Sequence, residues 1–325
     1  MSTNIHAEQK PLIYQIGKHV KLVDDAIFCK SIIADGKELI TGEEYGAIRV
    51  LELKDEKVYI TFKEDLTSLA NAFSGCSALK SIPENLFANC PKATDFSFTF
   101  FGCKALTAIP EGLFANNPKV TIFQGTFSYC SALKSIPEKL FANCPKVNTF
   151  FQTFAGCSAL KSIPENLFAN NPEVTEFTGT FSACSALTAI PENLFASNPA
   201  VTDFGSTFSN CSALATIPEK LFANCPKVTS FSRTFLACKT LKSVPAGLFD
   251  NNRKVTDFGS RFYGLFHNCS ALTGESPYTV IDGQKVHLYE RANYPEHFTA
   301  PSNVQKTFRE CYNLTDYNQI PSNWK

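Results

Sequence analysis

The sequence is poor in tryptophan and methionine and carries no net charge. Its 325 residues include one Trp and one Met, and its 30 acidic side chains balance its 30 Lys and Arg side chains. Nucleic-acid-binding domains present a basic face, so this balance argues against a nucleic-acid partner. No stretch approaches the roughly 20 apolar residues of a membrane-spanning helix, and we expect no membrane insertion.

The first residues also lack a targeting signal. The segment MSTNIHAEQKPLIYQIG has neither the basic start nor the apolar run of a secretory signal peptide. We therefore expect that the chain as given carries no export signal and no anchor. Its location is then the cell surface or extracellular space if a signal has been removed, and otherwise a virion or the cytoplasm.

Sequence patterns that mark catalytic and metal sites are missing as well. There is no GxSxG, HExxH or phosphate-binding loop. The five histidines are scattered, and no cysteine pair has the CxxC spacing of a zinc site. A recurring column of glutamates is interpreted as solvated charge rather than a calcium ladder, because no calcium-loop pattern surrounds it. We expect no enzyme, no metal and no cofactor.

What the sequence has instead is a fixed repeat rich in phenylalanine and cysteine. It contains 30 Phe and 13 Cys. Seven cysteines, the cysteine ladder, recur every 27 residues, each with Phe three residues before it and Leu three residues after it: Cys76, Cys103, Cys130, Cys157, Cys184, Cys211 and Cys238. Such a period is typical of a solenoid, whose long repeated surface suits binding better than a single chemical site.

The cysteines are interpreted as packing residues rather than disulfides. A second column with the same period alternates between two residue types, and comprises Cys90, Asn117, Cys144, Asn171, Asn198, Cys225 and Asn252. No two of its cysteines fall in neighbouring coils, which stack at roughly 4.8 Å, so they lie too far apart to bond. The ladder keeps its Cys wherever this column changes to Asn. We expect both columns to be small buried side chains.

Proline and β-branched residues divide each repeat into segments. The residue before Pro favours β conformation, so Ile82-Pro83 ends an extended segment. Pro83 suits the first position of a helix, which Pro91 stops after about two turns. The segment 119–123 (KVTIF) has the composition of a second short strand. The pattern predicts an α/β solenoid of about eight 27-residue repeats, each with a short strand and a short helix.

The N-terminal part of the chain does not repeat. Residues 1–65 have hairpin-turn signals at Asp35-Gly36 and at 54–57, between short strands expected at 20–23, 27–33, 48–53 and 58–62. A solenoid must cover its end coils. We predict that residues 1–65 form a β-rich N-terminal cap, with a docking module as the alternative.

The period also breaks towards the C-terminus. Residues 66–274 are assigned to the repeat solenoid and residues 275–325 to a C-terminal insertion and capping repeat. Four residues are added near 262–266, because Cys269 follows Cys238 by 31 residues rather than 27. The segment 275–303 is either a binding loop or part of the cap.

The repeated motif resembles a known family. Phe-x2-Cys-x2-Leu-x2-Ile-Pro, which recurs from Phe73 to Leu272 and in part again at 308–314, resembles the BspA-like leucine-rich-repeat family of bacterial surface proteins. The stretch from His287 to Trp324 is similar to segments that end repeat proteins of gut Bacteroidetes. The resemblance implies that the α/β solenoid is a right-handed, leucine-rich-repeat-like coil, and it implies a place at a cell surface. It implies little about a ligand, because the motif residues belong to the core.

Specificity must lie on residues that vary between coils, because the core columns are uniform. One variable column precedes the second-strand Phe, and its carboxylates are Asp95, Glu176, Asp203 and Asp257. The other flanks the Phe before Cys, where larger apolar residues replace the small ones common in other coils: Phe98, Phe101, Tyr129, Phe151 and Leu236. If exposed, these would form an apolar patch typical of partner sites. If buried, they would fill irregular core.

These observations favour a non-enzymatic interaction or adhesion module that binds a protein or glycan through the solenoid surface. The alternative is a structural virion component, a fibre or decoration protein, of a phage infecting Bacteroidetes. The missing export signal and the distinct N-terminal β-module favour that alternative. Residues 77–89 and 158–170 are identical, which indicates duplication and fits a scaffold of adjustable length. The ligand and the oligomeric state stay open.

Overall fold

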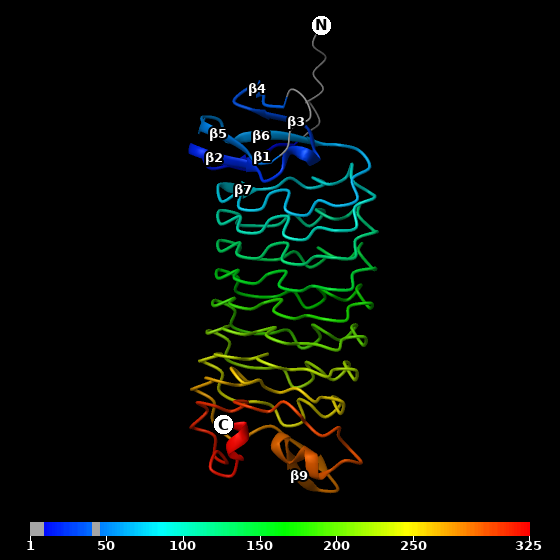
Figure 1. Ribbon diagram of the computed structural model, residues 1–325, viewed down its shortest axis with the longest axis vertical. Coiled ribbons are helices and arrows are strands. Elements are labelled where there is room, and N and C mark those ends of the chain that lie inside the picture. Colours follow the sequence, from blue (N-terminus) through cyan, green and yellow to red (C-terminus); the bar gives the residue numbers. More distant parts are fainter. Residues whose placement is uncertain (1–9, 41–45) are drawn as a thin grey trace.

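The chain forms a column of flattened, stacked coils. The computed structural model describes residues 10–40 and 46–325; residues 1–9 and 41–45, which belong to the predicted N-terminal cap, lie outside the described residues. Figure 1 shows the N-terminal strands at one end of the column and the C-terminal insertion at the other. Within the described ranges, no helix is long and apolar enough to cross a bilayer.

A ladder of single parallel bridges joins each coil to the next. Asp95 pairs with Ile122, Ile122 pairs with Thr149, and the series continues to Asp257. Backbone bonds nearby follow the same step, as where Phe100 N donates to Thr126 O at 2.8 Å. The 27-residue period of the sequence is therefore the step from one coil to its neighbour.

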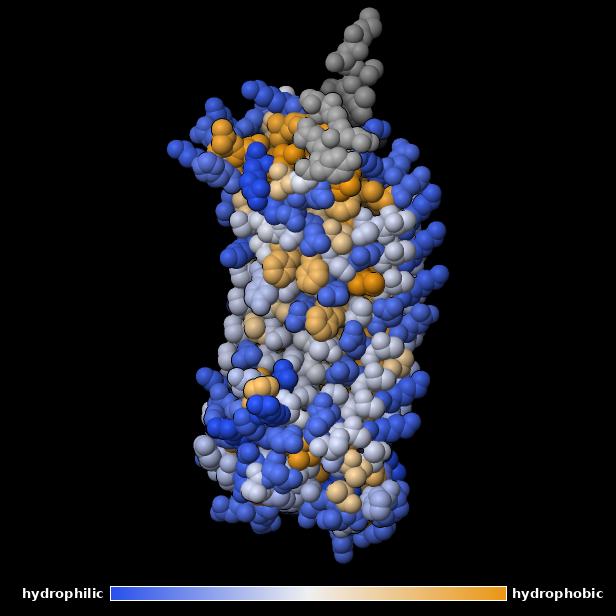
Figure 2. Space-filling view, viewed as in Figure 1, coloured by the Kyte–Doolittle hydropathy of each residue, from blue (hydrophilic) through white to orange (hydrophobic). Residues whose placement is uncertain are grey.

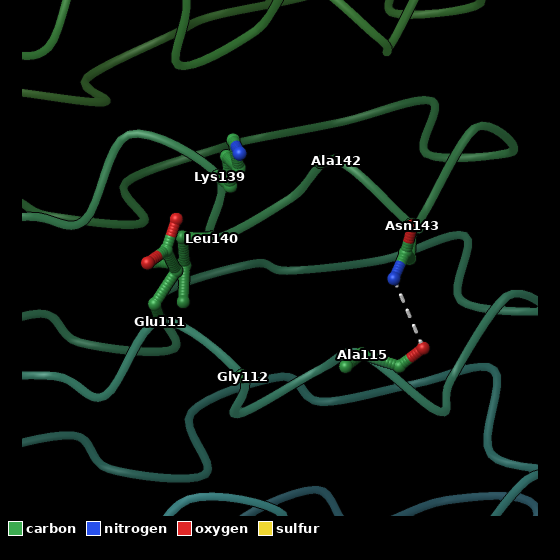
Figure 3. Close-up of a pocket in the computed structure, with 7 residues that line it drawn as sticks. All are labelled: Glu111, Gly112, Ala115, Lys139, Leu140, Ala142 and Asn143. Carbon is green, nitrogen blue, oxygen red and sulfur yellow. Dashed lines mark hydrogen bonds between the residues drawn. The ribbon is translucent and has the colours of Figure 1, made fainter.

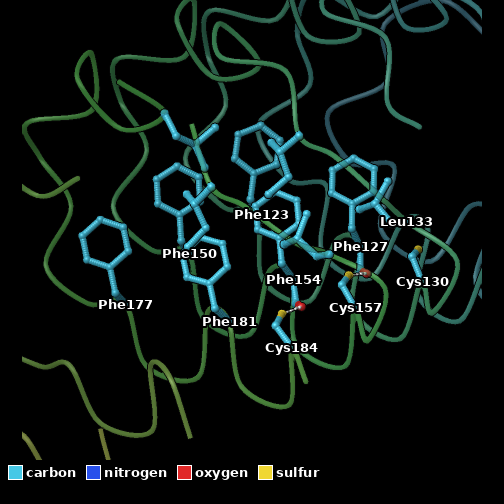
Figure 4. Packing of buried hydrophobic residues seen from close by; sticks show 14 of the residues in the cluster. Phe123, Phe127, Cys130, Leu133, Phe150, Phe154, Cys157, Phe177, Phe181 and Cys184 are labelled. Carbon is cyan, nitrogen blue, oxygen red and sulfur yellow. Dashed lines mark hydrogen bonds between the residues drawn. The ribbon is translucent and has the colours of Figure 1, made fainter. Parts of the chain in front are cut away.

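The core contains columns of stacked phenylalanines beside the cysteine ladder (Figure 4). The rings of Phe127 and Phe154 are 5.6 Å apart and nearly parallel. The thiol of Cys157 donates to Phe127 O in the preceding coil at 3.2 Å. All the described cysteines are buried and free. The ladder cysteines are buried, as the interpretation as packing residues expects, and each ladder thiol from Cys103 onward is also a hydrogen-bond donor.

The Cys/Asn column has a shared role too. Asn117 Nδ2 donates to Phe87 O at 3.2 Å and to Cys90 O at 2.8 Å. In the next coil, the thiol of Cys144 points to Phe114 O and Asn117 O at 3.9 and 3.6 Å. Cys and Asn alternate in this column because both are small and both offer a donor to the same two carbonyls.

The predicted short helix in each coil is wrong. The described residues contain no α-helix, only three 3-10 helices: η1 (Ala26–Phe28), η2 (Leu288–Asn293) and η3 (Ser322–Trp324). After Pro110 the backbone makes tight turns instead, with Leu113 N donating to Pro110 O at 3.3 Å and Asn117 N to Phe114 O at 3.1 Å. So short a segment forms too few i→i+4 bonds to offset helix nucleation. The turns also let the adjacent Leu113 and Phe114 both enter the core.

Extended structure inside the coils is shorter than predicted. Among the described repeats only β7 (Leu79–Ser81) is a strand, and the expected strand at 119–123 is a single bridge at Ile122. Directly after bridging residues such as Asp95 and Thr149 the chain turns, because the side chain of the bridging residue accepts a hydrogen bond from the backbone N–H two positions further on. Asp95 Oδ1 accepts from Ser97 N at 2.8 Å, and Thr149 Oγ1 accepts from Phe151 N at 3.0 Å. Such Asx and ST turns compete with a continued ladder.

The N-terminal strands continue directly into the first coil. One sheet has the order β4 (Lys37–Glu38), β3 (Cys29–Ala34), β6 (Lys57–Phe62), β1 (Leu12–Tyr14), β7, and β2 (Gly17–Val23) pairs with β5 (Ile48–Leu53) in a second sheet. The four expected strands correspond to β2, β3, β5 and β6. Because β7 belongs to the first repeat, the described strands before residue 65 pair directly with the first coil; the assignment of residues 1–65 as a cap stays a prediction.

One predicted hairpin turn is confirmed and the other is wrong. Asp35 and Gly36, with φ of 49° and 71°, join the antiparallel strands β3 and β4. The segment 54–57 instead leads from β5 to β6, which lie in different sheets. The Asp35 carboxylate holds this crossing, because it accepts from Lys54 N at 3.0 Å and from Asp55 N at 2.6 Å.

The C-terminal insertion closes the Cys/Asn column. It contains the hairpin of β8 (Tyr278–Ile281) and β9 (Gln284–His287), followed by η2. On η2, the buried Arg291 guanidinium donates to Asn252 O at 3.2 Å and Phe249 O at 2.9 Å. These are the carbonyls that an Asn or Cys of a further coil would bind. Arg291 stands in that place, which supports a cap rather than a binding loop for residues 275–303.

Candidate functional site

Two positions in each central coil have a left-handed backbone. The first left-handed column, with φ from 53° to 66°, is Asn71, Phe98, Gly125, Gln152, Gly179, Ser206 and Arg233. The second left-handed column, with φ from 57° to 73°, is Gly75, Gly102, Tyr129, Gly156, Ala183, Asn210 and Ala237. Glycine adopts this conformation freely, whereas other residues lose roughly 1–2 kcal/mol there. Large side chains in these columns therefore cost stability.

Three of the predicted site residues form one cluster, the aromatic patch: Phe98, Phe101 and Tyr129. The ring centroids of Phe98 and Phe101 are 5.9 Å apart, and those of Phe101 and Tyr129 are 5.4 Å apart, both edge to face. Tyr129 is 55% exposed and the two Phe are half-buried. Figure 2 shows apolar side chains gathered over the upper coils, below the N-terminal strands. The patch thus lies at the surface and not in the core.

The aromatic patch depends on glycines in the following coils. A Cβ on Gly125 would lie 2.4 Å from the Phe98 ring, and a Cβ on Gly156 would lie 2.7 Å from the Tyr129 ring. Each ring covers a position where the next coil has no side chain. In the sequence, each glycine follows its aromatic residue by one period of 27. This spacing could be interpreted as a packing relation only once the left-handed columns were known.

The other two apolar candidates are placed differently. Phe151 lies beside the aromatic patch, since its carbonyl accepts from Gly125 N at 2.8 Å. Leu236 occupies the column of Phe101 but lies five periods further along the chain and is partly buried. The structure therefore places the Phe151 backbone in the coil next to Gly125, while Leu236 lies apart from the aromatic patch.

The candidate carboxylates take part in internal hydrogen bonds. Asp95 and Asp203 accept the backbone N–H two residues further on, at 2.8 and 2.6 Å. Glu176 accepts from Thr149 Oγ1 at 2.8 Å. Burial raises the pKa of Asp257, opposed by hydrogen bonds from Gly259 N and the Ser230 hydroxyl. These contacts shape the turns of the ladder, and the four carboxylates do not form one cluster.

A pocket of ≈ 330 Å³ lies elsewhere in the coils (Figure 3). It is lined by Glu111, Gly112, Ala115, Lys139, Leu140, Ala142 and Asn143. Gly112 stands where the neighbouring coils have Asn85 and Lys139, so the hollow is the space of a missing side chain. Its charged groups, Glu111 and Lys139, are exposed. The pocket has no arrangement suited to catalysis.

A group of titratable side chains joins the C-terminal insertion to the last motif. His287 Nδ1 lies 3.1 Å from Glu290 Oε2 and His287 Nε2 lies 3.2 Å from Glu275 Oε1. The Asp316 carboxylate accepts from Ser276 N at 2.9 Å. Across residues 10–40 and 46–325, no group of three or more His, Cys, Asp or Glu side chains is placed to hold a metal ion. The contacts hold the insertion in place.

A family match covers most of the coils. The family model described as "BspA type Leucine rich repeat region" matches residues 58–272, in six copies. The chain belongs to this family. Its coils have the leucine-rich-repeat-type fold, while the handedness and the count of about eight repeats stay predictions. Members of this repeat family are generally non-enzymatic, and the family points to a binding or interaction module.

Several solved structures are similar to this chain. Toll, in the Toll–Spatzle complex from Drosophila, is 18% identical over 63% of this chain and 30% of its own, with a TM-score of 0.34. A leucine-rich cell surface protein from Faecalibacterium prausnitzii is 17% identical over 81% of this chain and 93% of its own, with a TM-score of 0.28. The chain spans less than a third of the Toll structure. No curated protein matches it.

Proposed function

We propose that this chain is a non-enzymatic adhesion module that binds a protein or glycan ligand through the aromatic patch. The family supports an interaction role in general terms. The patch supplies the contact surface, because exposed clustered aromatic side chains are typical of partner sites. The half-buried Phe101 packs edge to face against the exposed ring of Tyr129, and Phe98 packs against Phe101.

The observation that carries the proposal is the backbone of Tyr129. This residue has φ of 59° and is 55% exposed. Equivalent positions in the preceding and following coils are Gly102 and Gly156. The left-handed backbone of Tyr129 therefore lowers stability, and its half-exposed ring does not offset this loss by full burial. Strained residues of this kind cluster at functional sites.

The test compares Tyr129→Gly and Tyr129→Ala with Tyr312→Ala, a control at another exposed tyrosine (69% exposed). Binding of the full chain to arrays of glycans and extracellular-matrix proteins is measured. We expect both Tyr129 variants to lose the bound ligand and the Tyr312 variant to keep it. Tyr129→Gly should also raise the free energy of unfolding by about 1 kcal/mol, because glycine relieves the left-handed backbone.

Two results would contradict the proposal. The first is the absence of any ligand in both arrays. The second is a ligand whose affinity is the same for the wild type and for Tyr129→Gly. A stability gain without a binding loss would leave Tyr129 as a tolerated defect of the repeat and not a binding residue.

A further inference from the structure

A short insertion in the coil after Arg233 forms a tight turn, here the 260–263 turn. Gly259 and Gly264 pair in an antiparallel bridge at its base. Ser260 N donates to Tyr263 O at 2.9 Å, and the Ser260 hydroxyl donates to the same oxygen at 3.0 Å. The four extra residues noted in the sequence therefore make a closed turn with Arg261 and Phe262 at its tip.

The next coil fixes the base of this turn. A Cβ on Gly259 would lie 2.2 Å from Gln305 O, and a Cβ on Gly264 would lie 2.4 Å from the backbone of Lys306. Phe266 N, just after the turn, donates to Thr307 O at 2.9 Å. The glycines let the turn sit directly on neighbouring backbone, so its tip is held in one arrangement. A rigid display of this kind lowers the entropy cost of binding.

The 260–263 turn presents aromatic and cationic groups together. Phe262 is 60% exposed and Tyr263 is 47% exposed. The Arg261 guanidinium lies 5.4 Å from the centroid of the Phe262 ring. The Tyr263 ring lies 5.3 Å from the ring of His267. The tip therefore offers an aromatic ring and a guanidinium side by side.

Neighbouring coils add more cations. Five of the six arginines of the chain lie between residues 233 and 309. Backbone bonds place Arg233 in the coil before the turn and Arg309 in the coil after it: Phe235 N donates to Leu265 O at 3.0 Å, and Asn268 N donates to Arg309 O at 2.8 Å. Among the described residues, Arg233 and Asp203 lie near Asp257. Lys306 and Arg309 lie near His267 and Glu310, and Arg309 Nε is 3.7 Å from Glu310 Oε1. With Arg261, four cations and three carboxylates leave this surface net positive on a chain of zero net charge.

Two buried side-chain nitrogens beneath this surface have no hydrogen-bond partner among the described residues. His267 is only 7% exposed, and its Nδ1 has no hydrogen-bond partner among the described residues. The buried Nε of Arg233 is likewise unpaired within the described chain. Burial lowers the pKa of His267. The nearby Glu310 raises that pKa, while the positive charges of Arg309 and Lys306 lower it. A buried nitrogen that carries a hydrogen and has no acceptor costs about 1–3 kcal/mol, and an anionic group that reached it would supply the acceptor; His267 Nδ1 is such a donor in one of its two neutral tautomers.

We propose that the 260–263 turn, with Arg233, His267 and Arg309, binds the carboxylate or sulfate groups of an acidic polysaccharide. Arginine binds planar anionic groups through two parallel hydrogen bonds. An acidic sugar presents an anionic group beside an apolar ring face, which matches the adjacent Arg261 and Phe262. This site goes beyond the proposed function, because none of its residues belongs to the aromatic patch.

The test titrates the full chain with polygalacturonate, dextran sulfate, neutral dextran and poly-glutamate by isothermal calorimetry. We expect binding to one or both acidic polysaccharides, weakened by salt, and none to neutral dextran. Polygalacturonate binding identifies a carboxylate ligand and dextran sulfate binding a sulfate ligand. The double variant Arg233→Gln, Arg261→Gln should bind at least about tenfold more weakly, because it loses charge-assisted hydrogen bonds.

Arg253→Gln is the matched control, since Arg253 is exposed and lies outside the turn. Gln occurs naturally in the column of Arg233, at Gln152, so the double variant is expected to fold, and circular dichroism checks this. The proposal is overturned if neither acidic polysaccharide binds, if Arg253→Gln loses as much affinity as the double variant, or if poly-glutamate binds as tightly as the polysaccharides. Tyr129→Gly should leave this binding unchanged, so the two proposals fail separately.

Discussion

Single residues in this chain do more than fill the core. The ladder cysteines and the Cys/Asn column donate hydrogen bonds to carbonyls of the preceding coil. Burial raises the pKa of these thiols, to about 12 for Cys130 and Cys144 from an ordinary value of 9.0. Thiols held in this way stay protonated and unreactive at neutral pH.

The raised thiol pKa predicts a loss of stability in alkali. Unfolded thiols release their protons near pH 9 while folded thiols hold theirs to about pH 12, so each contribution is complete below pH 9 and is lost as the pH rises towards 12. Cys144→Asn, which introduces the residue found at Asn117 and Asn171, removes one such thiol. Its free energy of unfolding should fall less steeply than that of the wild type, by up to about 1.4 kcal/mol per pH unit above 9.

Urea unfolding at pH 7.5, 9.5 and 10.5 measures this difference. Lysine and tyrosine titration affects both proteins equally and cancels in the comparison. Parallel pH profiles for the two proteins would refute the role assigned to the buried thiol.

At the residue scale, the sequence predicted which columns are buried but not their hydrogen bonds. The period and the Cys/Asn exchange were enough to exclude disulfides. They did not reveal the left-handed columns, because φ follows from how a turn meets its neighbours and not from the identity of Tyr129 or Phe98. The aromatic candidates were found by their departure from small residues, whereas the Arg261–Phe262 tip was missed although the four-residue insertion was noticed.

At the scale of elements, the conformation of short segments is set by contacts with neighbouring coils and strands rather than by their own secondary-structure propensity. Residues 110–117 have helix-start signals but form turns, because each coil must place consecutive Leu and Phe side chains in the core. The hairpin signal at 54–57 was correct about a turn but wrong about the strands it joins. In the N-terminal part the strands were predictable from β-branched runs but their pairing was not, and in the coils the run at 119–123 forms only a single bridge.

The predicted capping role of the C-terminal insertion gives a testable prediction for Arg291. Arg291→Met removes the donors to Phe249 O and Asn252 O, and it removes a cation that lies 4.3 Å from the Phe298 ring centroid. Methionine keeps the apolar volume but leaves both carbonyls unpaired. We expect the free energy of unfolding to fall by about 2 kcal/mol, the scale of charge-assisted hydrogen bonds.

Chemical denaturation measures the loss, and limited proteolysis should show earlier cleavage within residues 275–303. Arg253→Met, at an exposed site, is the control and should change stability by less than about 0.5 kcal/mol. If Arg291→Met is as stable as the wild type, Arg291 does not close the column.

At the scale of the whole molecule, the stack is a sum of nearly identical interfaces. Each coil contacts only its neighbours, so stability is distributed along the axis. Aromatic columns, thiol donors and bridges all repeat at the same step, as the Phe127–Phe154 and Phe154–Phe181 stacks at 5.6 and 5.7 Å show. The length of the molecule is therefore adjustable without redesign of its core.

Removal of one whole period should leave a folded protein. Deletion of residues 158–184 joins Cys157 to Ser185 and keeps every column in phase. Circular dichroism and thermal unfolding should show a single cooperative transition at a moderately lower temperature. Deletion of 158–177 removes fewer residues but breaks the phase, and it should abolish the transition. Equal behaviour of the two deletions would mean that the columns do not govern stability.

The sequence by itself determined the period, the family, the buried columns and the departures at Phe98, Phe101 and Tyr129, because these depend on which residue types recur at a constant spacing. Only the tertiary structure decided the turns in place of helices, the left-handed columns, the closing role of Arg291 and the cationic 260–263 turn. Each of these arises from contacts between neighbouring coils or with the insertion. The residue pattern of one coil does not specify the backbone of the neighbouring coil or of the insertion against which it packs.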